Sequence, residues 1–253
     1  TIPLNINWQT TIRSGILETL SFMLLITRSG PGILALVRNK LRGSLSLLAD
    51  IKTLLERFVP HDFLRFLQKK SLVDAALGDN AQHEMTILFS DIRSFTTLSE
   101  SMTPEENFQF IHQYFSQMGA IVRQHNGFIE PYMGDAVMAL FERADDAVQA
   151  SIAMLHTLAE WNQGRRATGE PPLRIGIGLH TGMLLPGTIG EQHRIEGTVS
   201  SDAVNLASRV EGMTKMYGAS LLISEHTLQC LHDRGRYLIH IMDQVTVKGK
   251  TQP

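Results

Sequence analysis

The sequence predicts an α+β fold in which helices pack against a mixed β-sheet. Three observations support this prediction. From Met85 onward the pattern of apolar residues follows the order β-α-β-β-α-β, residues 104–125 have the apolar spacing of an amphipathic helix, and the apolar runs on either side of that helix have the length of strands. The chain is long enough, and at 43% hydrophobic residues apolar enough, for one large domain or for a domain plus an appendage.

Local signals place each element in turn. Thr103 and Pro104 open the helix over 104–125, because threonine caps a helix and proline fits its first turn. Ser201 or Asp202 can cap a later helix, and Gly218 can end it. The remaining predicted elements are strands over 86–91, 128–133 and 136–141, a helix over 144–163, a strand over 173–182, a loop through Gly190, a helix over about 202–217 and a strand over 220–224.

Residues 1–80 are poor in strand signals and predict a helical connector. Two helical stretches, 33–58 and 61–70, are separated by Pro60. The leucines of the first stretch have near-heptad spacing, which suits either pairing with another helix or packing within the same chain. No apolar run reaches the ~20 residues that span a bilayer. Because the sequence begins with threonine, we expect it to be part of a longer protein that carries a regulatory domain, and that protein could be membrane-associated.

The overall charge and the cysteine content narrow the functional classes. A formal net charge of −2 gives no electrostatic reason to expect nucleic-acid binding. The single cysteine, Cys230, excludes an internal disulfide and a thiolate metal cluster, and fits a cytoplasmic protein. We expect Cys230 to be a small buried residue on a helix.

Two aspartates follow predicted strands. Asp91 ends the first strand, and Asp135 lies in the Gly134-Asp135 turn after the strand over 128–133. If the helix between these strands makes a right-handed crossover, the strands are parallel and their carboxyl ends share one edge of the sheet. Each aspartate alone could simply stabilise a turn, but the pair predicts a site for hard cations. The free backbone N–H groups of residues 92–96 could hold phosphate oxygens beside those cations.

The predicted helix over 202–217 carries Asn205 and Arg209 on the same face, because they are four residues apart. This spacing fits a solvated stripe as well as it fits a functional pair. In the functional interpretation, Arg209 neutralises charge on a phosphoryl oxygen and Asn205 orients a ribose. Near the end of the chain, Lys248 and Lys250 flank Gly249 and could reach a triphosphate, although such a segment is usually a solvated turn.

Four segments in the same order resemble the catalytic domain of class III nucleotidyl cyclases: LFSDIRSFTTLSE at 88–100, GDAVMALF at 134–141, RIGIGLHTG at 174–182 and DAVNLASRVEG at 202–212. The preceding RFVPHDFLRFLQKK at 57–70 resembles the lead-in of cyanobacterial adenylate cyclases. The resemblance covers about residues 57–250. It implies a ferredoxin-like βαββαβ core and active sites at the interface of a head-to-tail homodimer. We therefore expect a connector over 1–56 and a catalytic domain over 57–253.

The resemblance also implies roles for individual residues. It places two Mg²⁺ or Mn²⁺ ions at Asp91, Ile92 and Asp135, and it places Asn205 and Arg209 of the partner subunit at the transition state. The substrate ATP would be bound by Phe95, Thr96, Pro131, Thr198, Lys248 and Lys250. His180 could be taken for a general base, but in the predicted strand over 173–182, near Gly182, we expect it to be structural. Two-metal cyclisation needs no protein nucleophile, which agrees with the lack of a convincing Ser-His-Asp or Cys-His arrangement in the sequence.

One position departs from the adenylate cyclase pattern. The lysine that reads the adenine base is replaced by Pro131, which has no donor, whereas Thr198 fits the second base-reading position. Glu130 lies one residue too early for the glutamate of guanylate cyclases. The sequence predicts an adenylate cyclase; the alternatives are relaxed or GTP selectivity, and a degenerate domain that binds a nucleotide or dimerises without catalysis. A diguanylate cyclase is disfavoured, because its Gly-Gly-Asp/Glu-Glu-Phe hairpin is absent.

Overall fold

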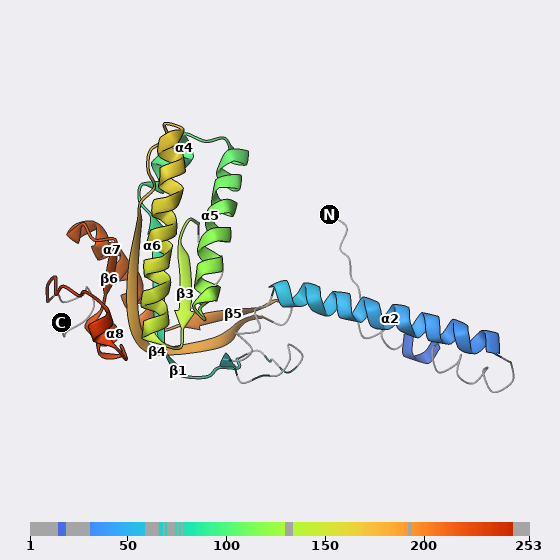
Figure 1. Cartoon of the computed structure of the whole chain (residues 1–253). Coiled ribbons are helices and arrows are strands. Elements are labelled where there is room, and N and C mark those ends of the chain that lie inside the picture. The colour runs from blue at the N-terminus through green and yellow to red at the C-terminus, as the bar shows by residue number, and fades with distance from the viewer. Residues whose placement is uncertain are drawn as a thin grey trace. The chain divides into compact units, whose positions relative to one another are not determined.

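The computed structural model describes residues 15–18, 31–58, 66–67, 69, 74, 76, 78–129, 134–191 and 194–244. The chain divides into two compact units, residues 1–61 and residues 62–253. The predicted helix over 61–70 lies almost entirely outside the described residues. Figure 1 shows the described elements along the chain.

The first unit contains α2 (Pro31–Phe58), which agrees with the predicted helix over 33–58. Several of its leucines are exposed, namely Leu36, Leu41, Leu45, Leu47 and Leu48. The described part of this unit therefore does not bury these leucines, which have near-heptad spacing. No helix in the described ranges is both long enough and apolar enough to cross a membrane.

The second unit is an α+β domain built on one mixed sheet. In the described residues its strands are β1 (His83–Ile92), β2 (Phe128–Ile129), β3 (Val137–Phe141), β4 (Ile175–Glu191), β5 (Arg194–Ser200) and β6 (Leu221–Ile223). The order across the sheet is β2-β3-β1-β4-β5, and β6 pairs with β4 in parallel. Both β1 and β2 are antiparallel to β3, so they run parallel to each other, as the predicted crossover requires.

Two apolar cores cover the two faces of this sheet. On one face α5 (Pro104–Gln124) and α6 (Ala144–Ala167) lie side by side against buried residues of β1 and β4 such as Leu88 and Leu179 (Figure 1). On the other face, Ala203 and Ala207 of α7 (Asp202–Tyr217) pack with Ile87. Short helices complete the domain: α4 (Phe95–Glu100), α8 (Glu225–Gln229) and the 3₁₀ helix η2 (Arg234–Arg236).

Local chemistry explains where the main helices begin and end. The Thr103 hydroxyl accepts from the Glu106 N–H at 3.2 Å and the Glu106 carboxylate accepts from the Thr103 N–H at 2.8 Å, which is a capping box. The Ser201 hydroxyl accepts from the Val204 N–H, and Gly218 ends α7 at φ 64°. The predicted caps of α5 and α7 are confirmed. The helix α6 extends four residues beyond the predicted end at 163.

The loop predicted through Gly190 is wrong. Strand β4 continues to Glu191 and pairs with β5, a strand that was not predicted. Pro186 and Gly187 gave this segment the composition of a loop. Long-range pairing keeps it extended: the Ala81 N–H donates to the Pro186 carbonyl at 3.1 Å, while β5 pairs on the other side. No bounds were predicted for α8, although Cys230, which directly follows it, was expected to lie on a helix.

Candidate active site

Asp91 and Asp135 meet at one edge of the sheet. Asp91 lies near the end of β1, which continues one residue beyond the predicted end, to Ile92. Asp135 lies in the turn that precedes β3, where Gly134 adopts φ 66°, a value that favours glycine. Because Ser90 pairs with Val137 in the β1–β3 ladder, this turn is held beside Asp91.

The two carboxyl groups interact electrostatically. Burial raises the pKa of the Asp135 carboxyl to about 6, and the neighbouring Asp91 carboxyl adds to the increase. The backbone N–H groups of Asp135 and Ile92 oppose it, because they stabilise the ionised form. The Asp135 Oδ2 atom is buried and has no hydrogen-bond partner among the described residues. Burial beside a second carboxyl group therefore favours a proton or a cation at Asp135.

Two buried hydroxyl groups are close to this pair. The Tyr114 side chain of α5 is fully buried, and burial, followed by the charges of Asp135 and Asp91, raises the pKa of its hydroxyl. The Ser90 hydroxyl is near enough to favour the ionised tyrosine slightly, yet neither hydroxyl makes a hydrogen bond with full geometry. Sequence reasoning missed Tyr114 because its spacing is that of an ordinary core residue of an amphipathic helix.

The residues present fit a divalent cation. A buried carboxylate oxygen without a partner, beside a second carboxylate, is the environment that a hard cation stabilises. The described residues contain no group of three or more His, Cys, Asp or Glu side chains that could hold an ion. Two carboxylates are enough for magnesium when substrate phosphates and water complete its coordination.

The turn after β1 only partly matches the predicted phosphate cradle. The Arg93 N–H donates to the Arg174 carbonyl at 2.8 Å, and the Ile92 N–H interacts with the Asp135 carboxylate. The prediction that all amides of residues 92–96 are free is therefore wrong at these two residues. Ser94 adopts φ 57°, a left-handed conformation that is uncommon for a residue with a Cβ. Phe95 and Thr96 open α4 directly after this turn.

Asn205 and Arg209 are both exposed on α7. The opposite face of the helix packs closely on β4, where Gly178 and Gly182 face it. A Cβ at Gly178 would collide with the backbone of Glu211, and one at Gly182 would lie 2.9 Å from the Ala203 Cβ. The helix backbone therefore lies directly on the strand, and its position fixes where Asn205 and Arg209 project.

Other predicted residues have a less complete description. Pro131, Lys248 and Lys250 lie outside the described residues, and Thr198 lies in β5 but its side chain is not among the described ones. Their predicted roles stay predictions.

Two further expectations concern His180 and Cys230. His180 is 8% exposed and its Nδ1 atom is 2.8 Å from the Ser224 hydroxyl, which agrees with a structural role. Cys230 is exposed, so the expectation that it is buried is wrong. It lies directly after α8, at the C-cap, where its side chain faces solvent rather than the core.

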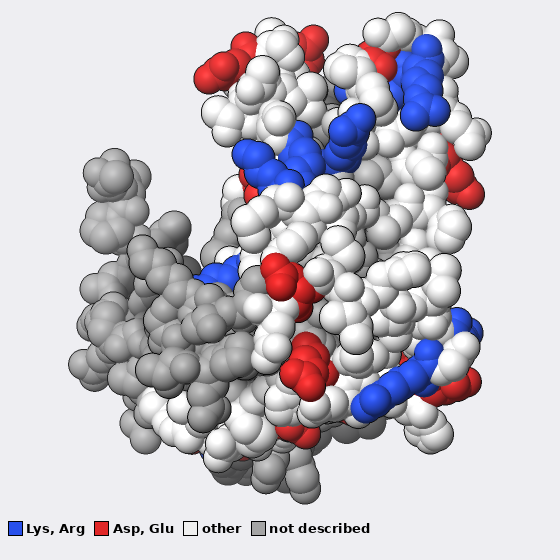
Figure 2. Space-filling model, turned by 90° about the vertical axis from the view of Figure 1, so that its left-hand side faces the viewer, with Lys and Arg blue, Asp and Glu red and all other residues white. Residues whose placement is uncertain are grey.

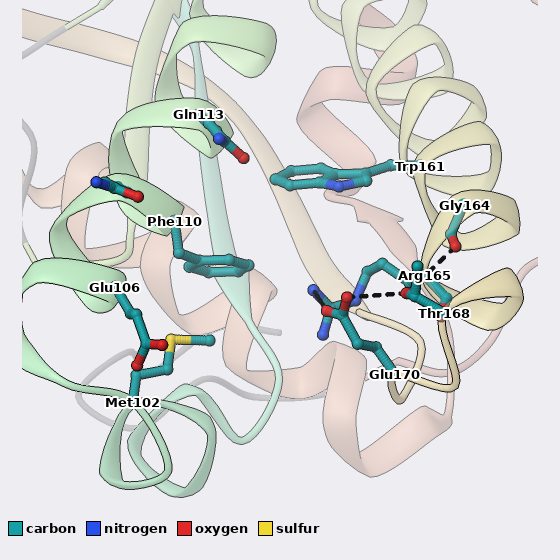
Figure 3. A pocket seen from close by; sticks show the side chains of 10 residues that line it. Met102, Glu106, Phe110, Gln113, Trp161, Gly164, Arg165, Thr168 and Glu170 are labelled. Carbon is teal, nitrogen blue, oxygen red and sulfur yellow. Dashed lines mark hydrogen bonds and ion pairs between the residues drawn. The ribbon is translucent and has the colours of Figure 1, made fainter.

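A separate cavity of about 460 Å³ lies between α5 and the end of α6 (Figure 3). Phe110 and Trp161 stack at its base with ring centroids 5.8 Å apart. The Arg165 guanidinium pairs with Glu170 at 2.8 Å and donates to the Pro171 carbonyl at 2.9 Å. The guanidinium of Arg165 is therefore already paired, and neither aspartate of the candidate site lines the cavity.

The surface charge of the described residues on one face gives no second candidate site. On the face shown in Figure 2, the basic and acidic side chains among the described residues form small separate groups. They do not join into the continuous basic surface that nucleic-acid binding requires.

Comparison with known proteins agrees with this geometry. The family model described as "Adenylate and Guanylate cyclase catalytic domain" matches residues 78–253. An adenylate cyclase of Anabaena cylindrica is 41% identical over 204 residues, which cover 78% of this chain and 41% of that protein. The chain spans less than half the length of the curated relatives that it matches first.

Solved structures have the same fold. The adenylyl cyclase CyaB from P. aeruginosa superimposes with a TM-score of 0.63 at 32% identity, covering 69% of this chain and 92% of that one. The guanylyl cyclase Cya2 superimposes with a TM-score of 0.57 at 33% identity, covering 69% of this chain and 89% of that one.

Proposed function

Because this chain belongs to the adenylate and guanylate cyclase catalytic domain family, we propose that it converts ATP into 3′,5′-cyclic AMP and pyrophosphate. The observation that carries the proposal is the half-buried pair of Asp91 and Asp135, with the unpartnered Oδ2 atom of Asp135. Two neighbouring carboxyl groups at a strand edge, one with a buried oxygen that no described residue hydrogen-bonds, fit a reaction in which cations and a triphosphate arrive together.

The chain's own residues would hold two Mg²⁺ or Mn²⁺ ions. Asp91 and Asp135 supply carboxylate oxygens, and Ile92, at the end of β1, lies between them and the turn to α4. When bound, the ions lower the pKa of the attacking ribose 3′-hydroxyl and neutralise the leaving pyrophosphate. The aspartates' task is therefore to stay ionised and fixed in position.

The remaining groups would come from two subunits. Phe95 and Thr96, at the start of α4, would lie along the phosphates of the substrate. Asn205 and Arg209 are exposed on α7, where they can project from one subunit into the site of the other. The Arg209 guanidinium would stabilise charge at the α-phosphate, and Asn205 would orient the ribose. Lys248 and Lys250 would contact the triphosphate.

Two alternatives to an adenylate cyclase are a cyclase with relaxed or GTP selectivity and a domain without catalytic activity. Overall sequence similarity does not tell whether the chain uses ATP or GTP, because its identity to an adenylyl cyclase, 32%, is nearly the same as its identity to a guanylyl cyclase, 33%. A non-catalytic domain is disfavoured, because Asp91, Asp135, Asn205 and Arg209 are all present. The regulatory domain expected elsewhere in the full-length protein is part of the proposal, since the chain spans only part of its relatives.

Turnover by the purified chain tests this function. The chain is incubated with ATP or GTP, each with Mg²⁺ or Mn²⁺, and the nucleotide products are separated by chromatography. We expect cyclic AMP in stoichiometric amount with pyrophosphate, dependent on the metal. Nucleotide binding without any cyclic product under all four conditions would favour the non-catalytic alternative.

A further inference from the structure

Arg93, two residues after Asp91, joins the candidate site to α7. Its Nη1 atom lies 3.4 Å from the Glu211 Oε1 atom, and its Nη2 atom donates to the Thr214 hydroxyl. The side chains of Arg93 and Glu211 are only 23% and 12% exposed. A pair so far removed from water is held in one geometry, unlike a mobile surface ion pair.

A glycine makes room for this cluster. Gly176 pairs with Asp91 across the β1–β4 ladder, and a Cβ at Gly176 would collide with the side chains of Arg93, Thr214 and Glu211. The cluster therefore lies directly beside the strand position opposite Asp91. Two strand ends and one helix are held together at this point.

The helix that receives this contact also carries the exposed Asn205 and Arg209. In an α-helix Asn205 is about 9 Å along the axis from Glu211, so a tilt of roughly 6° about Glu211 would move Asn205 by about 1 Å. A displacement of that size can cost on the order of 100-fold in rate when a group must meet a transition state. The orientation of α7 is thus critical for any group at its far end.

We propose that Arg93 and Glu211 are positioning residues that fix α7 against the strand bearing Asp91, so that Asn205 and Arg209 are held in place for the partner subunit's site. The proposal rests on the shared-site function proposed above. It means that the contact beside one active site controls the geometry of the other site in the dimer.

A heterodimer with a single competent site tests the direction of this effect. One subunit carries Asp91→Ala and supplies Asn205 and Arg209; the other carries Arg209→Ala and supplies both aspartates. Different affinity tags allow the mixed dimer to be isolated. Arg93→Met is then placed in either subunit, and Arg166→Met, at an exposed position of α6, serves as the matched control.

We expect Arg93→Met to lower kcat at least tenfold when it lies in the Asp91→Ala subunit, with the KM for ATP changed less than threefold. In that arrangement Arg93 belongs to the dead site and cannot contact the nucleotide being converted. Arg166→Met should have no effect in either subunit. A loss confined to the other subunit, or an equal loss in both, would overturn the proposal.

Hydrogen exchange measured by mass spectrometry tests the same idea without activity. Homodimers that carry only Arg93→Met or only Glu211→Gln are compared with the wild-type homodimer, all without nucleotide. We expect each substitution to raise the exchange rates of the α7 amides at least fivefold and to leave those of α5 unchanged. Unaltered protection of α7 in both variants would refute the positioning role. If the parent heterodimer is inactive, the shared-site function fails, and the exchange measurement still decides whether Arg93 holds α7.

Discussion

The carboxyl group of Asp91 raises the pKa of the Asp135 carboxyl, in addition to the larger effect of burial. The turn that contains Asp135 is brought to Asp91 by the β1–β3 ladder, so a contact between residues 44 positions apart depends on strand pairing. With a pKa of about 6 in place of the usual 3.8, Asp135 binds a proton at pH values where the unfolded chain has lost it.

This pKa predicts how stability depends on pH in the absence of metal. Between about pH 4 and pH 6 the folded protein binds more protons at Asp135 than the unfolded chain does, so the free energy of unfolding decreases as pH rises through this range. Asp135→Asn should remove this contribution. Thermal unfolding in EDTA at several pH values measures the difference between the two proteins; parallel pH profiles would contradict the assigned pKa.

Metal binding should become stronger as pH rises, whereas the stability of the metal-free protein decreases. A cation binds the ionised carboxylate, so Mn²⁺ affinity should fall as pH drops below about 6, and binding at pH 5.5 should release protons. Calorimetric titration in buffers of different ionisation enthalpy counts the protons released. Proton release that is the same in wild type and Asp135→Asn would show that the ion binds elsewhere.

Removing either aspartate should abolish metal-dependent turnover. Because a metal supplies several kcal/mol of transition-state stabilisation, we expect Asp91→Ala and Asp135→Ala each to lose at least ~100-fold in kcat. Circular dichroism and light scattering should show an unchanged fold and dimer. Activity near that of wild type in either variant would eliminate this site.

The two-subunit arrangement predicts complementation. In an equal mixture of Asp91→Ala and Arg209→Ala chains, random pairing makes half of the dimers mixed, and each mixed dimer has one intact site of two. Specific activity should therefore recover to roughly a quarter of the wild-type value. Native mass spectrometry confirms that subunits exchange; a mixture that exchanges but stays inactive would mean that the sites are not shared.

Gly178 predicts a stability effect specific to the contact between β4 and α7. Gly178→Ala would force a methyl group against the backbone of Glu211, which cannot rotate away, at a cost on the order of 1–3 kcal/mol. Gly212→Ala is the matched control within α7: a Cβ there meets nothing within 4 Å, so it should stabilise the helix by about 0.5–1 kcal/mol. Urea unfolding measures both; equal effects would refute the close packing.

Periodic local signals predicted much of the fold. The caps at Thr103 and Ser201 and the apolar spacing gave the positions of α5 and α7, because these signals lie within a few residues of one another. The extension of β4 could not be predicted in this way, since Pro186 and Gly187 are loop-forming residues that are held extended by distant partners.

In the candidate site, too, local sequence signals predicted some features, whereas features that depend on contacts between distant residues were missed. Asp91 and Asp135 could be paired from sequence because strand–helix–strand topology has a fixed handedness. The contact of Arg93 with Glu211 and the electrostatic interaction of Tyr114 with the aspartates depend on how helices lie on the sheet, which no local pattern encodes. The alternate glycines at Gly176 and Gly178 were the one available sequence signal for the close approach of α7.

The last prediction concerns the base and rests on the sequence at Pro131. Proline cannot donate the hydrogen bond by which lysine distinguishes the adenine edge, and a hydrogen bond to a charged group contributes about 1.5–3 kcal/mol. We therefore expect only a modest preference for ATP over GTP in the wild-type chain. Pro131→Lys should raise the ATP/GTP ratio of kcat/KM by roughly tenfold or more, at ~1.4 kcal/mol per decade.

A control variant separates the new donor from the loss of the proline ring. Pro131→Met has a side chain of similar length without a charge, so it should leave the ATP/GTP ratio near that of wild type. If wild type is already strongly selective for ATP and Pro131→Lys changes nothing, the base is read at another position. Thr198, in β5, is then the residue to substitute next, because the sequence resemblance predicts that it contacts the base.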